Sequence, residues 1–372
     1  MYNISIFKNE KLHNILCTVL ISLFPLSLII GSLVINIFCI LIIIIFLFEC
    51  FKIKNFTFLK SKEFLLLFIF WVFLLINTLM STNFESSYQR GFGFIRFIFL
   101  VFALRYYFYL NQKKYAKFIF AIWSLTFLVI TFDLMFESYF GFNLLGFTTI
   151  YPGRLAGFSG DELKIGGYYY GFIAITLTYT LLNYRKYFYI LFFLFLLIAL
   201  LIGERGNFLK ILIMLMPFAI ILKYNNKIKI SYLLSILVVT ISLIFIFKPN
   251  YKLKFYNELF TNYKNLNLNS ILSKSEKHKA HYIASYKIFR DNLVFGVGLK
   301  NFRNESGKDK YKNDNEKIKA WSTHPHQIHL EFLSETGLVG YIIFCLFFFV
   351  SIFNGLKNYF YNKNLYTLAG TL

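Results

Sequence analysis

Sixteen consecutive residues near the N-terminus decide the fold class: Leu33-Val-Ile-Asn-Ile-Phe-Cys-Ile-Leu-Ile-Ile-Ile-Ile-Phe-Leu-Phe48 contains one polar amide, Asn36. A run of this kind, extended to about 20 residues, is long enough to cross a bilayer as a helix. The whole chain has the same character, because 58% of its 372 residues are apolar and only 15% are charged. This composition excludes a secreted, cytosolic or disordered protein and predicts an integral membrane protein.

Ten apolar runs predict an all-α, polytopic membrane protein. The expected spans are residues 15–31, 33–51, 64–80, 93–110, 117–134, 166–183, 187–202, 207–223, 231–247 and 337–354. The first run is too long for a cleaved signal and no small-x-small site follows it, so we expect it to remain as an anchor. The four cysteines lie in or beside apolar runs without a CxxC pair, so neither a disulfide framework nor a zinc site is expected.

The basic residues predict the orientation. With a cytoplasmic N-terminus, the inner connections hold 17 Lys and Arg, the short outer ones hold six, and sixteen lie in a long loop to which the orientation rule does not apply. Both termini are therefore expected inside. The predicted parts are residues 1–247 with outer connections 135–165 and 203–206, a large, partly helical periplasmic loop at 248–331, and the last span with its tail at 332–372. Within the loop, apolar spacing predicts a helix near 278–292.

Topology explains much of the formal charge of +21, but not the loop, where sixteen basic residues accompany eight acidic ones. An outward basic surface suits an anionic substrate at the membrane face, such as a lipid-linked phosphate or pyrophosphate. A solvated Lys/Asn-rich loop in a compositionally biased proteome explains most of these lysines equally well. No RNA-binding signature or nucleotide-binding glycine loop accompanies the charge, so nucleic acid is not an expected partner.

Three of the six histidines lie in Trp321-Ser-Thr-His-Pro-His-Gln-Ile-His329. Pro325 suits the first turn of a helix, with Thr323 or His324 as its cap. This predicts one helical face formed by His326, Leu330, Leu333, Gly337 and Gly340. The two glycines would let another helix approach closely. At the helix N-terminus, His326 would lie where phosphate binds and where an imidazole stays neutral, as a general base requires.

Three interpretations of these histidines compete. A metal site is the weakest, because no Asp or Cys completes the imidazoles at a familiar spacing. A structural role, in which the rings cap and hydrogen-bond a re-entrant helix, suits His324 and His329. A general base at His326 is favoured only if other polar groups converge on it.

Such polar groups occur in other outer connections. Arg154 and Glu162 belong to Gly153-Arg-Leu-Ala-Gly-Phe-Ser-Gly-Asp-Glu162, and Arg205 belongs to Gly203-Glu-Arg-Gly206. Arg96 enters the fourth span from the same side. An unpaired guanidinium beside an apolar run is costly, so Arg96 and Arg205 are expected to pair with Glu162, Glu204 or a substrate phosphate.

Four ordered segments resemble the O-antigen ligase and O-antigen polymerase superfamily of bacterial envelope glycosyltransferases. His326-Gln327, nine residues and then Gly337-Leu-Val-Gly340 resemble the ligase pattern, with Gln327 in place of the usual Asn. Arg154-Leu-Ala-Gly-Phe158 is similar to the family's Arg-x-x-Gly-Phe segment, and Glu204-Arg-Gly206 is similar to its Ser-Arg-Gly segment. Phe295-Gly-Val-Gly-Leu-Lys-Asn-Phe302 resembles the turn that leads into the active-site part of its periplasmic loop.

The resemblance implies a GT-C-like architecture in the bacterial inner membrane and an inverting, metal-independent and cofactor-free transfer on the periplasmic side. The implied donor is an undecaprenyl-diphosphate-linked glycan, and the acceptor is a hydroxyl of lipid A-core or of another glycan, met among membrane lipids. By position, His326 would deprotonate the acceptor, Arg154 and Arg205 would hold the pyrophosphate, and Arg96 would assist. The implied supporting residues are Glu162, His324, Gln327, Gly337 and Gly340.

Ligase and polymerase share these motifs, so that choice stays open. Two other classes compete: a flippase for the same lipid-linked sugar, and a non-catalytic protein of an envelope assembly. A flippase predicts charges at mid-membrane and internal repeats, whereas the charges here gather at one face. Relatives usually continue through further helices, whereas only residues 355–372 follow the tenth span, which suggests a shortened member or a truncated frame.

Overall fold

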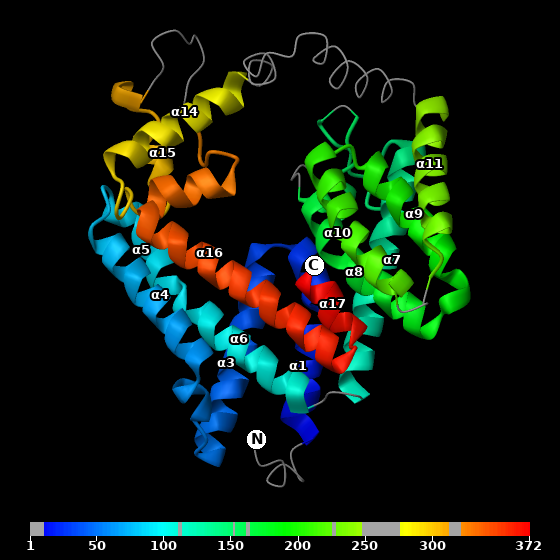
Figure 1. Ribbon diagram of the computed structural model, residues 1–372, viewed down its shortest axis with the longest axis horizontal. Coiled ribbons are helices and arrows are strands. Elements are labelled where there is room, and N and C mark those ends of the chain that lie inside the picture. The colour runs from blue at the N-terminus through cyan, green and yellow to red at the C-terminus, as the bar shows by residue number, and fades with distance from the viewer. Residues whose placement is uncertain are drawn as a thin grey trace. The chain divides into compact units, whose positions relative to one another are not determined.

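The computed structural model describes residues 11–110, 114–151, 153–160, 164–224, 228–247, 276–311 and 321–372, and within them every regular element is a helix (Figure 1). Six of the described helices are long and apolar enough to cross a membrane, or seven if one bent pair counts as a single span. The expected all-α, polytopic membrane class is therefore confirmed. The count of ten spans stays a prediction.

A helix covers each of the ten apolar runs. The first run is divided into α1 (Lys11–Ser22) and α2 (Phe24–Ile30), which bend by 49°. The others are α3 (Ser32–Ile53), α4 (Lys62–Leu79), α5 (Phe84–Gly93) with α6 (Ile95–Leu110), α7 (Lys114–Phe140), α8 (Ile165–Asn183), α9 (Phe188–Leu201), α10 (Arg205–Tyr224), α11 (Ile230–Phe247) and α16 (Ile328–Asn362). The helix expected near 278–292 is confirmed as α14 (Glu276–Asp291).

Contacts between residues divide the chain into two compact units. Unit 1 comprises residues 1–45, 105–256 and 351–372, and unit 2 comprises residues 46–104 and 257–350. The units are assembled from segments that are distant in the sequence. The expected division at 247 and 331 concerns position relative to the membrane, and it stays a prediction.

Helix α8 forms the centre of unit 1, where it packs against α7, α9, α10 and the short α17 (Leu365–Thr371). Its side chains Tyr169, Ile173 and Leu177 are fully buried. The Tyr169 hydroxyl lies 3.1 Å from the Thr131 hydroxyl of α7, which satisfies a polar group inside an apolar core. This core holds the C-terminal ends of α7 and α9 at fixed positions.

Two buried carboxylates at the end of α7 hold the loop that follows it. Glu137 accepts hydrogen bonds from the backbone N–H groups of Ala156, at 3.0 Å, and of Gly157, at 2.7 Å. One turn earlier, Asp133 accepts the N–H of Leu144 at 2.8 Å. Both carboxylates are at most 2% exposed. Each carboxylate accepts hydrogen bonds from backbone N–H groups that folding removes from water, and this offsets the cost of their desolvation.

Helix α16 of unit 2 is broken at Gly337, where φ is 67° and ψ is −169°. The turn after α14 lies against the break: Leu338 N–H donates to Leu293 O at 2.8 Å, and Gly298 N–H donates to Glu335 O at 2.9 Å. The segments that begin at Phe295 and at Gly337 are thus interlocked through their backbones.

Asn77 of α4 completes this interlock. Its Nδ2 donates to Phe295 O at 2.6 Å and to Glu335 O at 3.0 Å, while its Oδ1 accepts Leu299 N–H at 3.2 Å. The side chain is 1% exposed. In an apolar environment, a helix break requires such internal partners for the carbonyl groups that it releases.

We expect Gly337→Ala to destabilise unit 2 by about 3 kcal/mol or more, because its backbone conformation is nearly restricted to glycine. An added Cβ would also lie 2.3 Å from Val294 O. The matched control is Gly93→Ala, whose Cβ meets nothing within 4 Å. Thermal unfolding in detergent measures both variants. Equal midpoints for the two would contradict the role of the break.

We expect Glu137→Ala to cost about 3 kcal/mol, because two buried N–H groups lose a charged acceptor. Trypsin should then cleave the purified protein faster after Arg154, which lies just before those two N–H groups. Ser138→Ala is the control, because Ser138 is only partly buried and its hydroxyl bonds only to its own helix. If the two variants are cleaved at the same rate, Glu137 does not hold the loop.

Candidate functional site

Two of the predicted segments meet in unit 1. Leu155 N–H donates to Ile202 O at 3.2 Å. Gly203, with φ 77°, lies so close to the 153–154 backbone that an added Cβ would be 2.3 Å from Gly153 O and 3.4 Å from the Cα of Arg154. The loop that carries Arg154 is therefore packed on the turn that leads into Arg205.

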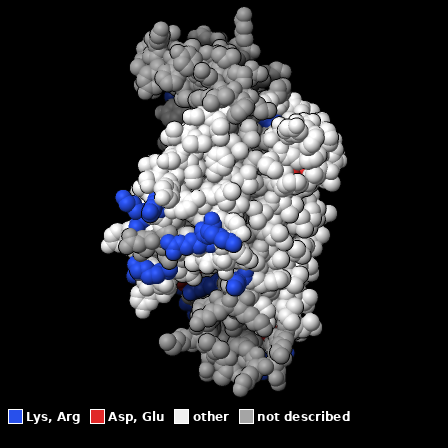
Figure 2. Space-filling model, turned by 90° about the vertical axis from the view of Figure 1, so that its right-hand side faces the viewer, with Lys and Arg blue, Asp and Glu red and all other residues white. Residues whose placement is uncertain are grey.

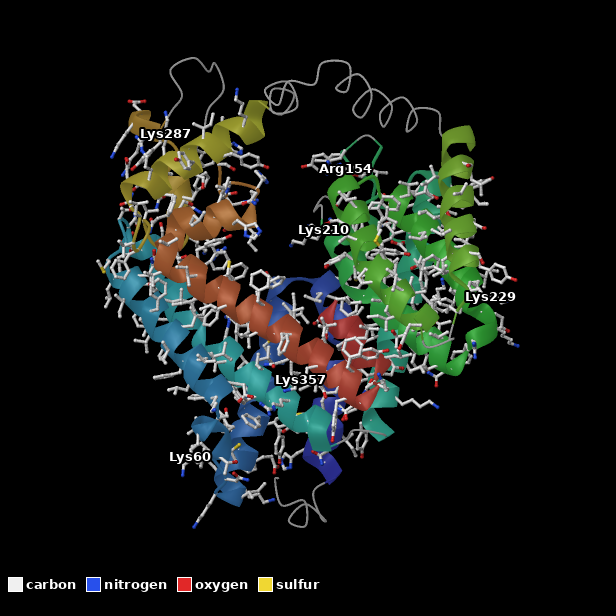
Figure 3. The ribbon with its side chains drawn as sticks, in the orientation of Figure 1. Lys60, Arg154, Lys210, Lys229, Lys287 and Lys357 are labelled. Atoms are coloured by element: carbon white, nitrogen blue, oxygen red, sulfur yellow. The ribbon has the colours of Figure 1, made fainter. Side chains whose placement is uncertain are left out.

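Arg154 is partly buried, and its guanidinium carbon lies 6.0 Å from the centre of the Tyr151 ring. It forms no ion pair with a carboxylate of the described residues. Figure 3 shows Arg154 at the same end of unit 1 as Lys210. Arg205 is the first residue of α10. This end of unit 1 therefore presents cationic residues from two separate segments.

Glu204, beside Arg205, faces the start of α8. Its Oε2 accepts a hydrogen bond from Asn207 Nδ2, and it lies so close to Gly166 that a Cβ there would be 2.2 Å away. Its Oε1 is buried without a hydrogen-bond partner among the described residues. The expected pairing of Arg96 or Arg205 with Glu204 stays a prediction, and Glu162 lies outside the described residues.

The predicted start of the histidine-bearing helix is wrong. Helix α16 begins at Ile328, and its cap is Gln327, whose Oε1 accepts Leu330 N–H at 2.6 Å. His326 has φ 59°, a left-handed conformation that cannot continue a helix, so Pro325 lies outside the first turn. Neither Thr323 nor His324 caps this helix.

The same break corrects the predicted helical face. Because Gly337 interrupts α16, His326, Leu330, Leu333, Gly337 and Gly340 do not lie on one continuous helix. Gly337 admits the backbone of the turn at 293–298. Gly340 does lie close to another helix, because a Cβ there would be 2.8 Å from the Phe73 ring of α4.

The imidazole rings of two other histidines lie against His326. His324 lies 4.2 Å from it between ring centres, tilted by 55°, and His281 of α14 is stacked on it at 5.5 Å and 25°. His326 is exposed, whereas His281 is only 7% exposed. No group of three His, Cys, Asp or Glu residues in the described parts could hold a metal ion.

The other two predicted histidines have local hydrogen-bond partners. His324 Nδ1 lies 2.9 Å from the Thr323 hydroxyl, and His329 Nδ1 lies 3.1 Å from the Tyr341 hydroxyl one helical segment later. His329 is thus turned towards the helix side chains beyond the break. Of the three histidines in this segment, His326 has the least ordinary backbone conformation.

Arg96 lies in unit 2, near the start of α6. Its guanidinium carbon is 4.8 Å from the centre of the Phe97 ring, and its Nε is buried without a hydrogen-bond partner among the described residues. A second basic group surrounds Lys300, whose pKa is lowered by burial and by the nearby charges of Arg90 and Arg303. Unit 2 therefore also has cations suited to an anion.

The predicted residues fall into two groups. Arg154 and Arg205 belong to unit 1, while Arg96, His326 and the two glycines belong to unit 2. The structure packs the Arg154 loop on the turn before Arg205. The convergence of all these residues on one substrate stays a prediction.

Sequence reasoning missed several residues that position these groups: Asn77, Asp133, Glu137, His281 and Glu335. The acids had a readable signal, because carboxylates inside an apolar helix must be satisfied by specific partners. The Glu335 carboxyl accepts hydrogen bonds from Lys300 N–H at 2.8 Å and from Phe302 N–H at 3.3 Å. Asn77 and His281 carry no comparable local signal.

Comparison with protein families gives one match, to the family described as O-Antigen ligase, over residues 190–345. No curated protein and no solved structure matches the chain. The matched range includes Arg205, His326, Gly337 and Gly340, and it excludes Arg96 and Arg154. Over residues 190–345, this multi-pass membrane protein is therefore similar to the O-antigen ligase family, a glycosyltransferase-like family of bacterial envelope enzymes.

Proposed function

We propose that the protein transfers a glycan from an undecaprenyl-diphosphate-linked donor to a hydroxyl of lipid A-core or of another glycan. The reaction takes place at the periplasmic face of the inner membrane, with both termini cytoplasmic, and it inverts the anomeric centre. The observation that carries the proposal is the packing of the Arg154 loop on the turn before Arg205, together with the family domain that contains Arg205 and His326.

The two arginines hold the departing pyrophosphate. A diphosphate leaves readily only if its developing charge is met, and a guanidinium meets two phosphate oxygens at once. Arg154 has no carboxylate partner among the described residues, so its charge is available to a ligand. Arg96 contributes a further contact, which is consistent with its buried and unsatisfied Nε.

His326 removes the proton from the acceptor hydroxyl. Its left-handed backbone is costly for a residue with a side chain, and such strain collects at functional sites. The rings of His324 and of His281 in α14 lie against His326, and they restrict the orientation of its imidazole. The proposal requires that this base and the arginines of unit 1 act on the same bound donor and acceptor.

The decisive experiment reconstitutes the purified protein in vesicles with a diphosphate-linked oligosaccharide and two acceptors, lipid A-core and the same oligosaccharide. A glycosylated lipid A-core identifies a ligase, and a lengthened oligosaccharide identifies a polymerase. Movement of the donor across the bilayer without a new glycosidic bond would overturn the proposal in favour of a flippase.

In this assay, His326→Ala should lower the transfer rate by about 10²- to 10⁴-fold, because the acceptor loses its general base. His329→Ala is the matched control and should retain activity, since His329 bonds Tyr341. Addition of EDTA should leave the wild-type rate unchanged. Normal transfer by His326→Ala would remove the base assignment, and loss of activity in EDTA would restore a metal site to consideration.

Arg154→Lys and Arg205→Lys should each reduce transfer at least about tenfold, because a lysine cannot make the paired contacts of a guanidinium with phosphate. The alanine variants should be less active still. Lys210→Gln is the control, because Lys210 lies at the same end of unit 1 and bonds Asn207. Full activity of both lysine variants would show that paired contacts are not required.

A further inference from the structure

The end of unit 1 farthest from Arg154 carries a concentration of basic residues. The Arg154 loop packs on Ile202 and Gly203, just after the end of α9. Arg185 and Lys186 lie just before the first residue of α9, about 20 Å away along a helix of this length. Neither residues 165–203 nor residues 205–256 include an Asp or a Glu. Figure 2 shows Lys and Arg side chains gathered on one side of the molecule, and Figure 3 labels Lys229, which directly precedes α11.

A cavity of about 350 Å³ opens within this basic region. It lies where the end of α8 and the start of α9 meet the segment that leads into α11. Arg185 and Lys229 line it together with Tyr189, Tyr232, Leu181 and Phe188. The lining therefore combines two cations with apolar and aromatic walls, which suits an amphipathic anion.

Hydrogen bonding and ring packing fix the shape of the cavity. The Tyr189 hydroxyl accepts Lys229 N–H at 2.8 Å. The rings of Tyr189 and Tyr232 meet edge to face at 5.4 Å, and the Lys229 ammonium lies 5.4 Å from the centre of the Tyr232 ring. The segment before α11 is thereby tied to α9, so Lys229 is held beside the two tyrosines, and Arg185 lines the same cavity.

The cavity lies next to the end of a candidate membrane span. The candidate span in α10 runs from Gly206 to Tyr224 and ends beside the segment that lines the cavity. Tyrosines and basic residues at the ends of apolar helices mark the membrane–water boundary. A phospholipid can therefore place its phosphate between the cations and its glycerol and first acyl carbons against Leu181 and Phe188.

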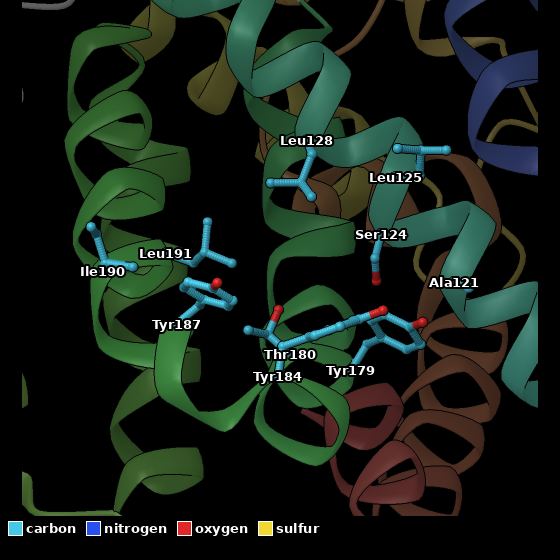
Figure 4. Close-up of a pocket in the computed structure, with 10 residues that line it drawn as sticks. All are labelled: Ala121, Ser124, Leu125, Leu128, Tyr179, Thr180, Tyr184, Tyr187, Ile190 and Leu191. Atoms are coloured by element: carbon cyan, nitrogen blue, oxygen red, sulfur yellow. The ribbon is translucent and has the colours of Figure 1, made fainter.

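A neighbouring cavity in unit 1 provides an internal contrast. It has about 370 Å³, lies between α7, α8 and α9, and is lined by Tyr179, Tyr184, Tyr187 and other residues without a formal charge (Figure 4). This second cavity thus resembles the first in size and in its tyrosines, but its lining contains no cation. Of these two cavities, only the one at Arg185 and Lys229 has the charge needed to select an anion.

We propose that this cavity binds the headgroup of one anionic phospholipid, with Arg185 and Lys229 as the phosphate ligands. The site is separate from the transfer chemistry, because it lies at the opposite end of α9 from Arg154. Binding stabilises the packing of α9 against α11, since the lipid contacts residues of both.

The test measures retention of radiolabelled phosphatidylglycerol by the full-length protein in phosphatidylcholine nanodiscs. Arg185→Gln and Lys229→Gln should each weaken binding about fivefold, and the double variant about thirtyfold. Lys186→Gln is the matched control and should bind as the wild type does. Lys186 carries a charge next to Arg185 but lies over the Tyr187 ring and does not line the cavity.

Three results would overturn the proposal. An equal loss in Lys186→Gln would indicate general surface attraction, and retention of phosphatidylcholine to the same extent would remove the selection for an anion. Displacement of the lipid by inorganic phosphate would identify a site for free anions. Thermal unfolding of each variant in lipid-free detergent should match the wild type, which separates lost binding from lost folding.

Discussion

The hydrogen bonds that Asn77 makes with Phe295 O and Glu335 O hold the break in α16 together. A chain with so few polar residues cannot rely on water to satisfy the backbone groups released by irregular segments. A buried polar side chain therefore supplies the partner at each place. Glu137 does this for the loop after α7, as Asn77 does at the break. The positions of Arg154 and of the histidine segment depend on these few side chains.

The sequence predicts the helical class and the position of most helices because hydropathy is a local property. A helix covers each apolar run of the sequence, and the apolar spacing near 278–292 predicted α14. The start of α16 could not be predicted in the same way. Pro325 is compatible with a first helical turn, but the left-handed backbone of His326 and the cap by Gln327 depend on tertiary packing. Gly337 was recognised as a close-contact position, but the contact is a turn and not a helix.

In the candidate site too, features with a local signal could be predicted from the sequence, whereas contacts between distant residues could not. Motif order indicated that Arg154 and Arg205 act together, but the contact between their segments rests on the bond from Leu155 to Ile202 and on the close approach at Gly203. No local pattern encodes a contact between residues about fifty positions apart. Conversely, Asp133 and Glu137 stand one turn apart within an apolar helix, and this spacing is a local signal that marks both acids as anchors for a neighbouring segment.

The way Glu137 holds the loop also affects the charge of the site. A carboxylate that paired with the Arg154 guanidinium would fix the arginine but neutralise it towards a phosphate ligand. The oxygens of Glu137 are instead occupied by the N–H groups of Ala156 and Gly157, which follow the arginine in the same loop. The acid thus fixes the backbone beside the arginine without neutralising the guanidinium, as the proposed role of Arg154 requires. Positioning by backbone bonds, without ion pairing, is what an arginine needs if it is to take the place of a metal ion.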